Sequence, residues 1–237
     1  MARFIPRDAF GIPNSIPKTY FLGHHQAGAN KIKTVLPTIS LVLECRDFRL
    51  PLSTHNPYLE RSLAGRERLV VYTKSDLGSD SRGAKNALKR GRLLGQEQEV
   101  HHGRPHPTAQ GVALAHGIKK GLIQDEILVD YLLYRMNLFD PEMYGRYCEP
   151  TNDVNDFLAA VATKEGRLRP GGIPNIPEAA ARVLSQWRDG RMGRFVLDDL
   201  SEDAIRAHEI MLAEPRLSIN QAKKLQKEER KKEKSSE

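Results

Sequence analysis

Two short apolar runs decide the fold of this chain: ISLVLEC at residues 39–45 and LVVY at residues 69–72. Runs rich in β-branched and leucine side chains, with little polar alternation, are typical of strands buried on both faces. Between them, Asn56-Pro57 favours a turn and residues 58–63 favour a short helix. Strand, helix and strand at this spacing form a βαβ unit, so the sequence predicts two parallel strands joined by a right-handed crossover.

The chain has two cysteines, Cys45 and Cys148, which lie far apart in the sequence and lack CxxC spacing. This pattern argues against a disulfide framework and against a zinc site. Cys45 ends the first apolar run, so we expect its thiol to be buried like a small apolar side chain.

The tetrapeptide Thr73-Lys74-Ser75-Asp76 directly follows the second apolar run. In guanine nucleotide-binding proteins, Asn or Thr, then Lys, any residue and Asp stand at this point. The Asp carboxylate can accept hydrogen bonds from the N1–H and the exocyclic amine of guanine, and adenine lacks this pair of donors. The Lys stem packs over the base, and the first residue ties neighbouring loops together. We therefore predict that Thr73, Lys74 and Asp76 bind guanine.

Two further segments frame the predicted strands: YFLGHH (20–25) precedes the first strand, and DFRLPLS (47–53) follows it. In this order, together with residues 73–76, they resemble the YlqF/RbgA family of ribosome-assembly GTPases and its mitochondrial members, whose G domain is circularly permuted. Farther along, AAARVLSQWRDGRMGRFVLDDL (179–200) resembles the close of that family's helical domain. The resemblance covers roughly residues 17–95 and 107–200.

One part of the family's pattern is missing. After the guanine-specificity motif, family members carry a P-loop of the G-x-x-x-x-G-K-S/T type, and no such P-loop occurs in the 237 residues. The only place for it is near residues 95–107, where a His-, Gly- and Pro-rich linker stands instead. A P-loop supplies backbone N–H groups, a phosphate-binding lysine and a Mg²⁺ ligand. We therefore expect GTP or GDP to bind weakly, hydrolysis to be impaired, and no Mg²⁺ or other metal site to be identifiable.

The resemblance implies an α/β fold: a truncated remnant of a circularly permuted P-loop G domain, followed by an orthogonal all-helical C-terminal domain. It also implies a catalytic candidate, because His24 aligns with the histidine that the family is thought to use to promote hydrolysis. The alternative is that His24 caps or packs against a helix start. The implied organisation is an N-terminal leader (1–19), a partial G domain (20–98), a linker (99–106), a helical domain (107–212) and a basic tail (213–237).

Helical periodicity dominates the second half of the chain. Apolar spacing and capping residues predict helices at residues 109–120, 124–138, 154–165 and 177–189, and a shorter helix at 23–34. The helix at 177–189 carries one apolar stripe, which we expect to lie in the core and not at a cofactor. That stripe consists of Ala180, Val183, Leu184 and Trp187.

The formal net charge of +7 favours a polyanionic partner such as RNA, or an anionic membrane face, without choosing between them. Residues 223–234 contain seven basic and three acidic residues, and a turn around Gly190 and Gly193 would hold three arginines outward together. The alternative is that the arginines pair with acids such as Asp198 and Asp199, while the tail only aids solubility. The predicted RNA-binding residues are Arg188, Arg191, Arg194, Lys223, Lys224, Lys227, Arg230, Lys231 and Lys232.

These features leave three functions open. The first is a mitochondrial factor that binds rRNA and assists assembly of the large ribosomal subunit; the second is an active GTPase whose P-loop exon is absent from this translation. The third is a structural mitoribosomal protein. An acid-poor N-terminal stretch resembles a transit segment, so we expect the mitochondrial matrix, with peripheral inner-membrane contact. No apolar stretch approaches the roughly 20 residues that span a bilayer.

Overall fold

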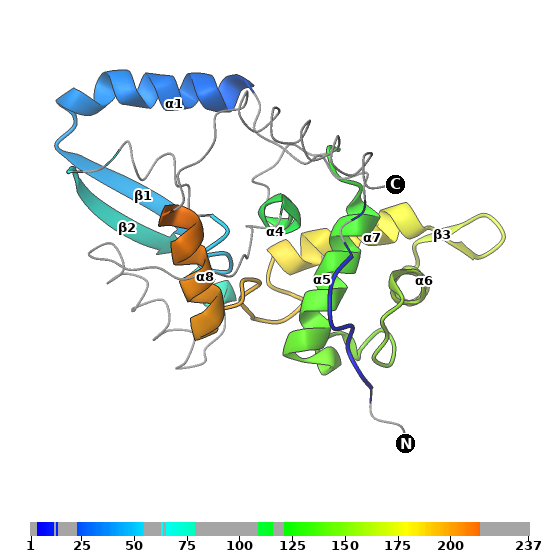
Figure 1. Cartoon of the computed structure of the whole chain (residues 1–237). Coiled ribbons are helices and arrows are strands. Elements are labelled where there is room, and N and C mark those ends of the chain that lie inside the picture. Colours follow the sequence, from blue (N-terminus) through cyan, green and yellow to red (C-terminus); the bar gives the residue numbers. More distant parts are fainter. Residues whose placement is uncertain are drawn as a thin grey trace, which may run out of the picture.

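A computed structural model describes residues 4–11, 13, 23–54, 63, 65–78, 109–115 and 121–213 (Figure 1). The strands β1 and β2 lie on one side of the molecule and the helices α4 to α7 on the other. The predicted linker at 99–106, the basic tail, and the crossover helix apart from Leu63 fall outside the described residues. The mixed α/β class is confirmed.

β1 spans Leu41–Asp47 and β2 spans Glu67–Thr73, and the two strands pair in parallel. The register sets Leu43 beside Leu69 and Asp47 beside Thr73. Both predicted strands and their parallel pairing are therefore confirmed, with each strand shifted or extended by a few residues relative to the apolar run. The helix α1, Gly23–Val35, also lies where the sequence predicts it.

The burial of the sheet differs from the prediction. Along both strands exposed and half-buried residues alternate, and the exposed face is the apolar one: Leu43 is 62% exposed and Leu69 is 52% exposed. Cys45 shares that exposed face, so the prediction of a buried thiol is wrong. On the other face, the Glu44 carboxylate accepts hydrogen bonds from Arg46 (2.7 Å) and Arg68 (3.2 Å).

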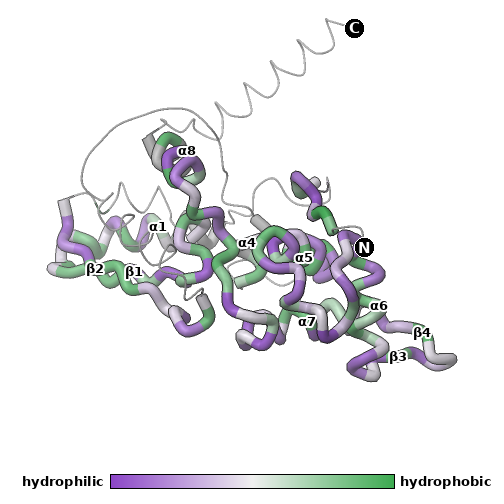
Figure 2. Tube along the Cα trace, turned by 90° about the horizontal axis from the view of Figure 1, so that it is seen from below, coloured by the Kyte–Doolittle hydropathy of each residue, from purple (hydrophilic) through white to green (hydrophobic). Residues whose placement is uncertain are grey.

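The physical reason is that the described part of the chain covers little of this face of the sheet. A strand is buried on both faces only when helices or another sheet cover both faces. Among the described elements β1 and β2 pack mainly against each other. The hydrophobic residues that Figure 2 marks along β1 and β2 therefore include leucines that are exposed on one face of the sheet.

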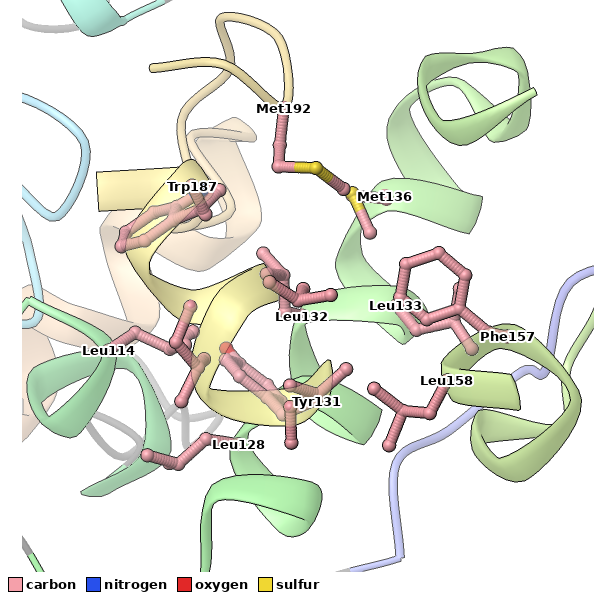
Figure 3. Close-up of a cluster of buried hydrophobic side chains, with 14 of the residues drawn as sticks. Leu114, Leu128, Tyr131, Leu132, Leu133, Met136, Phe157, Leu158, Trp187 and Met192 are labelled. Carbon is pink, nitrogen blue, oxygen red and sulfur yellow. The ribbon is translucent and has the colours of Figure 1, made fainter. Parts of the chain in front are cut away.

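The four helices predicted in the second half of the chain are present, but the prediction that this part is all-helical is wrong, because it also contains a short β-hairpin. α4 (Ala109–Leu114), α5 (Asp125–Phe139), α6 (Val154–Lys164) and α7 (Ile176–Arg188) match four predicted helices, although α4 is shorter than predicted and residues 116–120 are not described. α7 packs against both α5 and α6. The stripe of α7 is fully buried, and Figure 3 shows Trp187 beside Leu132 and Leu114 in this core. The interpretation of the stripe as core is confirmed.

Two described elements are additions to the prediction. A small antiparallel hairpin, β3 (Leu168–Arg169) and β4 (Ile173–Pro174), turns at two glycines with positive φ, and α8 spans Glu202–Ala213. The hairpin strands are too short to produce an alternating pattern in the sequence. The described chain also contains the short 3-10 turns η1 (Leu36–Thr38), η2 (Ser75–Leu77) and η3 (Pro141–Tyr144).

The N-terminal segment 4–11 contains no helix or strand, yet it is anchored on α5. Arg7 Nη2 donates to Asp130 Oδ1 (2.6 Å), and its guanidinium lies 5.8 Å from the ring of Tyr134. Phe10 packs edge-on against Tyr131, with ring centroids 5.2 Å apart. This part of the predicted leader therefore contributes side chains to the edge of the helical core.

Candidate functional site

The candidate site lies where the carboxyl ends of β1 and β2 meet. Because the strands are parallel and Asp47 pairs with Thr73, the loops DFRLPLS (47–53) and TKSD (73–76) start side by side. Phe48 N donates to Thr73 O (2.9 Å), and Thr73 Oγ1 donates to Arg46 O (3.2 Å). In parallel α/β sheets, ligands bind outside the carboxyl ends of the strands. The structure thus brings together two of the segments that carry the family resemblance in the sequence.

Lys74 adopts an unusual backbone conformation. Its φ of 55° and ψ of 33° are left-handed, and it is the one residue other than glycine with positive φ in the described part of the chain. For a residue with a Cβ this costs about 1–2 kcal/mol. The Lys74 ammonium lies 3.3 Å from Asp47 Oδ2, and the turn η2 follows at once, with Asp76 exposed in it. The predicted guanine-binding residues are therefore adjacent and open to solvent.

Asp47 is clamped by a buried arginine. Arg49 Nε donates to Asp47 Oδ1 (3.1 Å) and Arg49 Nη2 to Asp47 Oδ2 (2.9 Å), in a bidentate ion pair. Partial burial would raise the pKa of the Asp47 carboxyl, but the hydrogen bonds and charges of Arg49 and Lys74 outweigh it and lower that pKa. Asp47 therefore stays an anion, and it serves both cations at once.

The helical part anchors this site at two points that the sequence analysis did not identify. The Arg49 guanidinium stacks on the ring of Trp187 at the end of α7, 4.1 Å from its centroid. Asp198 accepts hydrogen bonds from Leu52 N (2.7 Å), Ser53 N (2.8 Å) and Ser53 Oγ (2.5 Å). Burial raises the pKa of Asp198 despite these hydrogen bonds. Trp187 and Asp198 both lie in the segment 179–200, but no local sequence pattern predicts their contacts with residues 49–53.

The three predicted arginines do not all point outward. Arg188 is half-buried, its Nε donates to Leu114 O (2.8 Å), and burial lowers the pKa of its guanidinium. The expectation that it faces solvent with the others is wrong, because it caps the end of α4. Arg191 and Arg194 are exposed on the turn that Gly190 and Gly193 form with positive φ.

Several predicted residues are not placed by the structure. His24 lies in the first turn of α1, but its side chain is outside the described part. The basic residues from Lys223 to Lys232 also lie outside it. Within the described ranges, no group of three or more His, Cys, Asp or Glu side chains could hold a metal ion. Nor does any described helix combine the length and apolar character that a membrane crossing needs.

Comparison with known proteins gives relatives that are named as GTPases or as guanine nucleotide-binding proteins, although no family model matches the chain. "Mitochondrial GTPase 1" of Schizosaccharomyces japonicus is 25% identical over 299 aligned positions, which include 78% of this chain and 91% of that protein. "Mitochondrial GTPase 1" of Schizosaccharomyces pombe is 39% identical over 99 residues, 41% of this chain and 30% of that protein. "Ribosome biogenesis GTPase A" of Bacillus cereus is 36% identical over 61 residues, 26% of this chain and 21% of that protein.

The long alignment also measures what this chain lacks. Because 78% of 237 residues fill far fewer than 299 positions, more than a third of those positions have no counterpart in this chain.

Among solved structures, GNP-bound YlqF from T. maritima is 16% identical with a TM-score of 0.46, and the match covers 74% of this chain and 99% of that one. The chain is therefore similar to proteins that are named mitochondrial GTPase and ribosome biogenesis GTPase.

Proposed function

We propose that this protein is a mitochondrial ribosome-assembly factor of the GTPase family, which binds guanine through Thr73, Lys74 and Asp76 and contacts rRNA of the large subunit. The observation that carries the proposal is the TKSD loop at the carboxyl end of a parallel strand, beside the anionic Asp47. The relatives support the setting, since they carry the names mitochondrial GTPase and ribosome biogenesis GTPase.

The guanine chemistry rests on the exposed end of the loop. The Asp76 side chain is exposed, so its carboxylate can accept the N1–H and amine hydrogen bonds that guanine offers and adenine does not. The Lys74 side chain is 47% exposed, which leaves its stem accessible to a base. The Thr73 hydroxyl is occupied in tying β2 to β1, the role expected of the first residue of the motif.

The site lacks the residues that bind nucleotide phosphates in this class of GTPase. Phosphoryl transfer depends on positioning and on neutralising the phosphate charge, and the sequence has no P-loop to supply either. We propose that GTP and GDP bind weakly and that hydrolysis is impaired, with any contribution of His24 small. No residue of this chain is proposed as a Mg²⁺ ligand.

The rRNA contact is proposed for the exposed turn at Arg191 and Arg194 together with the basic tail from Lys223 to Lys232. Such cations contact phosphates, which position a protein on RNA without reading its sequence. The same positive charge suits the matrix face of the inner membrane as a secondary, peripheral contact. Arg188 is left out of this contact because its guanidinium is held by α4.

The test of the guanine site compares fluorescently labelled GDP and ADP in titrations with the purified protein. We expect weak binding of GDP, weaker binding of ADP, and loss of the difference in Asp76→Asn. The matched control is Glu67→Gln, an exposed acid at the far end of β2 that should leave both affinities unchanged. Equal affinity for the two purines in the parent protein would contradict the proposal.

A second candidate is an active GTPase, favoured by the many positions of the S. japonicus alignment that have no counterpart here. In that case the working transcript carries a P-loop exon. Sequencing the transcript across the codons for residues 95–107 separates the two candidates, because an exon inserted there would restore the phosphate site. A transcript that matches the printed sequence would support the assembly factor with impaired hydrolysis.

A further inference from the structure

We propose that Arg49 is a positioning residue for the guanine-specificity loop, residues 73–78. Braced by Trp187, it fixes the Asp47 carboxylate, and Asp47 in turn fixes the ammonium of Lys74. The inference rests on the proposed guanine site, since it names what holds that site in shape. It assigns to the end of α7 a role in the loop that follows β2.

The bracing of Arg49 is strong on both sides. Its side chain is 1% exposed and lies against the Trp187 ring, a contact in which the planar guanidinium loses little freedom per interaction. Its backbone is held as well, because Leu197 N donates to Arg49 O (2.8 Å). Arg49 therefore keeps one position set by the helical part.

Arg49 transmits that position to Asp47. Besides the two side-chain bonds, Arg49 N donates to Asp47 Oδ1 (3.0 Å), so the carboxylate is held by three donors from a single residue. Oδ2, which accepts from Arg49 Nη2, also faces Lys74 Nζ at 3.3 Å. A carboxylate fixed in this way offers Lys74 one well-defined partner.

Lys74 needs such a partner because its backbone is strained. The left-handed conformation persists only where surrounding contacts favour it. Leu77 N donates to Lys74 O (3.0 Å), and the Leu77 side chain fills the space beside Gly190, where an added Cβ would lie 2.5 Å from Leu77 Cδ2. Phe48 closes the loop in the same way, since a Cβ on Gly78 would lie 2.1 Å from Phe48 Cδ1.

The consequence is that the loop takes its shape from the end of α7 as well as from β2. If Asp47 or Arg49 is altered, the Lys74 ammonium loses its fixed partner. The aliphatic stem of Lys74 is then no longer held in one conformation against the base. The loop should then open more often, and guanine should lose its advantage over adenine. If Arg49 had a purely structural role, its replacement would lower the free energy of unfolding without changing the preference for guanine over adenine.

The experiment combines hydrogen–deuterium exchange of residues 73–78 with titrations of labelled GDP and ADP. The variants are Asp47→Asn, which keeps shape, Arg49→Lys, which keeps charge, and Lys74→Met, an exposed change that keeps a similar stem. The matched control is Glu44→Gln, since Glu44 on β1 also pairs with two cations, Arg46 and Arg68, but lies away from the loop. Fluorescence of Trp187, the single tryptophan, checks that the helical part is folded.

We expect exchange at residues 73–78 to rise by about tenfold or more in the three variants, as for loss of a charged hydrogen bond, and not in Glu44→Gln. The preference for GDP over ADP should shrink by a similar factor. The inference would be overturned if exchange were unchanged in Lys74→Met and in whichever of Asp47→Asn and Arg49→Lys are folded. An unchanged preference for GDP over ADP in Asp47→Asn would overturn it as well. If exchange rises in the three variants but the parent protein shows no preference for GDP, the positioning role is upheld and the guanine site is refuted.

Discussion

The two-stranded sheet and the helical core each present a face of apolar side chains, but the two faces lie in different environments. In α7 the predicted stripe is fully buried against α5 and α6 (Figure 3). In β1 and β2 the leucines and Val71 on one face remain exposed, and the salt-bridged Glu44 lies on the other face. An apolar side chain stabilises a fold only when another layer removes it from water. Among the described residues, the apolar face of α7 is therefore covered by other helices, and the apolar face of the sheet is not.

The largest expected effect compares two leucines, one from each region. Leu132→Ala, at a fully buried position of α5, should lower the free energy of unfolding by about 2–5 kcal/mol through lost burial and a cavity. Leu43→Ala, on the exposed sheet face, should cost less than about 1 kcal/mol. Denaturant unfolding followed by circular dichroism measures both. If Leu43→Ala costs as much as Leu132→Ala, the sheet face is covered in solution and the comparison fails.

The next effect concerns the joint between the two regions. Asp198→Ala removes the acceptor of three hydrogen bonds from Leu52 and Ser53, so we expect a loss of about 2 kcal/mol in the free energy of unfolding. Asp199→Ala is the matched control, because the exposed Asp199 accepts one bond, from Ser201 N. The measurement is thermal unfolding of both variants. Equal melting temperatures for the two would show that Asp198 does not hold the loop.

A pH dependence sharpens the comparison from the helical side. Hydrogen bonds from Arg182, Tyr147 and Gln186 lower the pKa of Glu165 from its ordinary value of 4.5 to about 2. Since the folded-state pKa is lowered, the stabilisation is present above about pH 4.5 and is lost as the pH falls towards 2.

We expect the melting temperature of the parent to fall across that window and that of Glu165→Gln to fall less, measured by circular dichroism at intervals of pH. Glu178→Gln serves as a control, because Glu178 pairs with Arg167 at an exposed position. A pH profile of Glu165→Gln that matches the parent would remove Glu165 from the acid response of the helical part.

The smallest effect uses the two thiols as reporters of the two regions. Cys45 is exposed on the sheet, whereas Cys148 is half-buried beside the helical core, where burial and the nearby Asp156 raise its thiol pKa. A maleimide reagent should therefore label Cys45 first in the native protein, with little change in stability. Mass spectrometry of Cys45→Ser and Cys148→Ser assigns the two rates. Faster labelling of Cys148 would mean that the sheet face is protected.

Much of the candidate site could be predicted from local sequence. A strand followed by TKSD, and another followed by DFRLPLS, implies that the two loops meet once the strands pair in parallel, and Asp47 does lie beside Thr73. What holds the loops could not be predicted this way. Trp187 and Asp198 lie far along the chain from Arg49 and Ser53, and periodicity describes only which face of an element is apolar.

Local sequence patterns were enough to predict the two parallel strands, the helices α1 and α4 to α7, and the buried stripe of α7, because these follow from apolar spacing, capping and turn residues. Three features depend on tertiary contacts: one face of the sheet is exposed, Cys45 lies on that face, and Arg188 binds the end of α4. Burial and hydrogen bonding depend on which layers meet, and a local pattern specifies a face without specifying its neighbour.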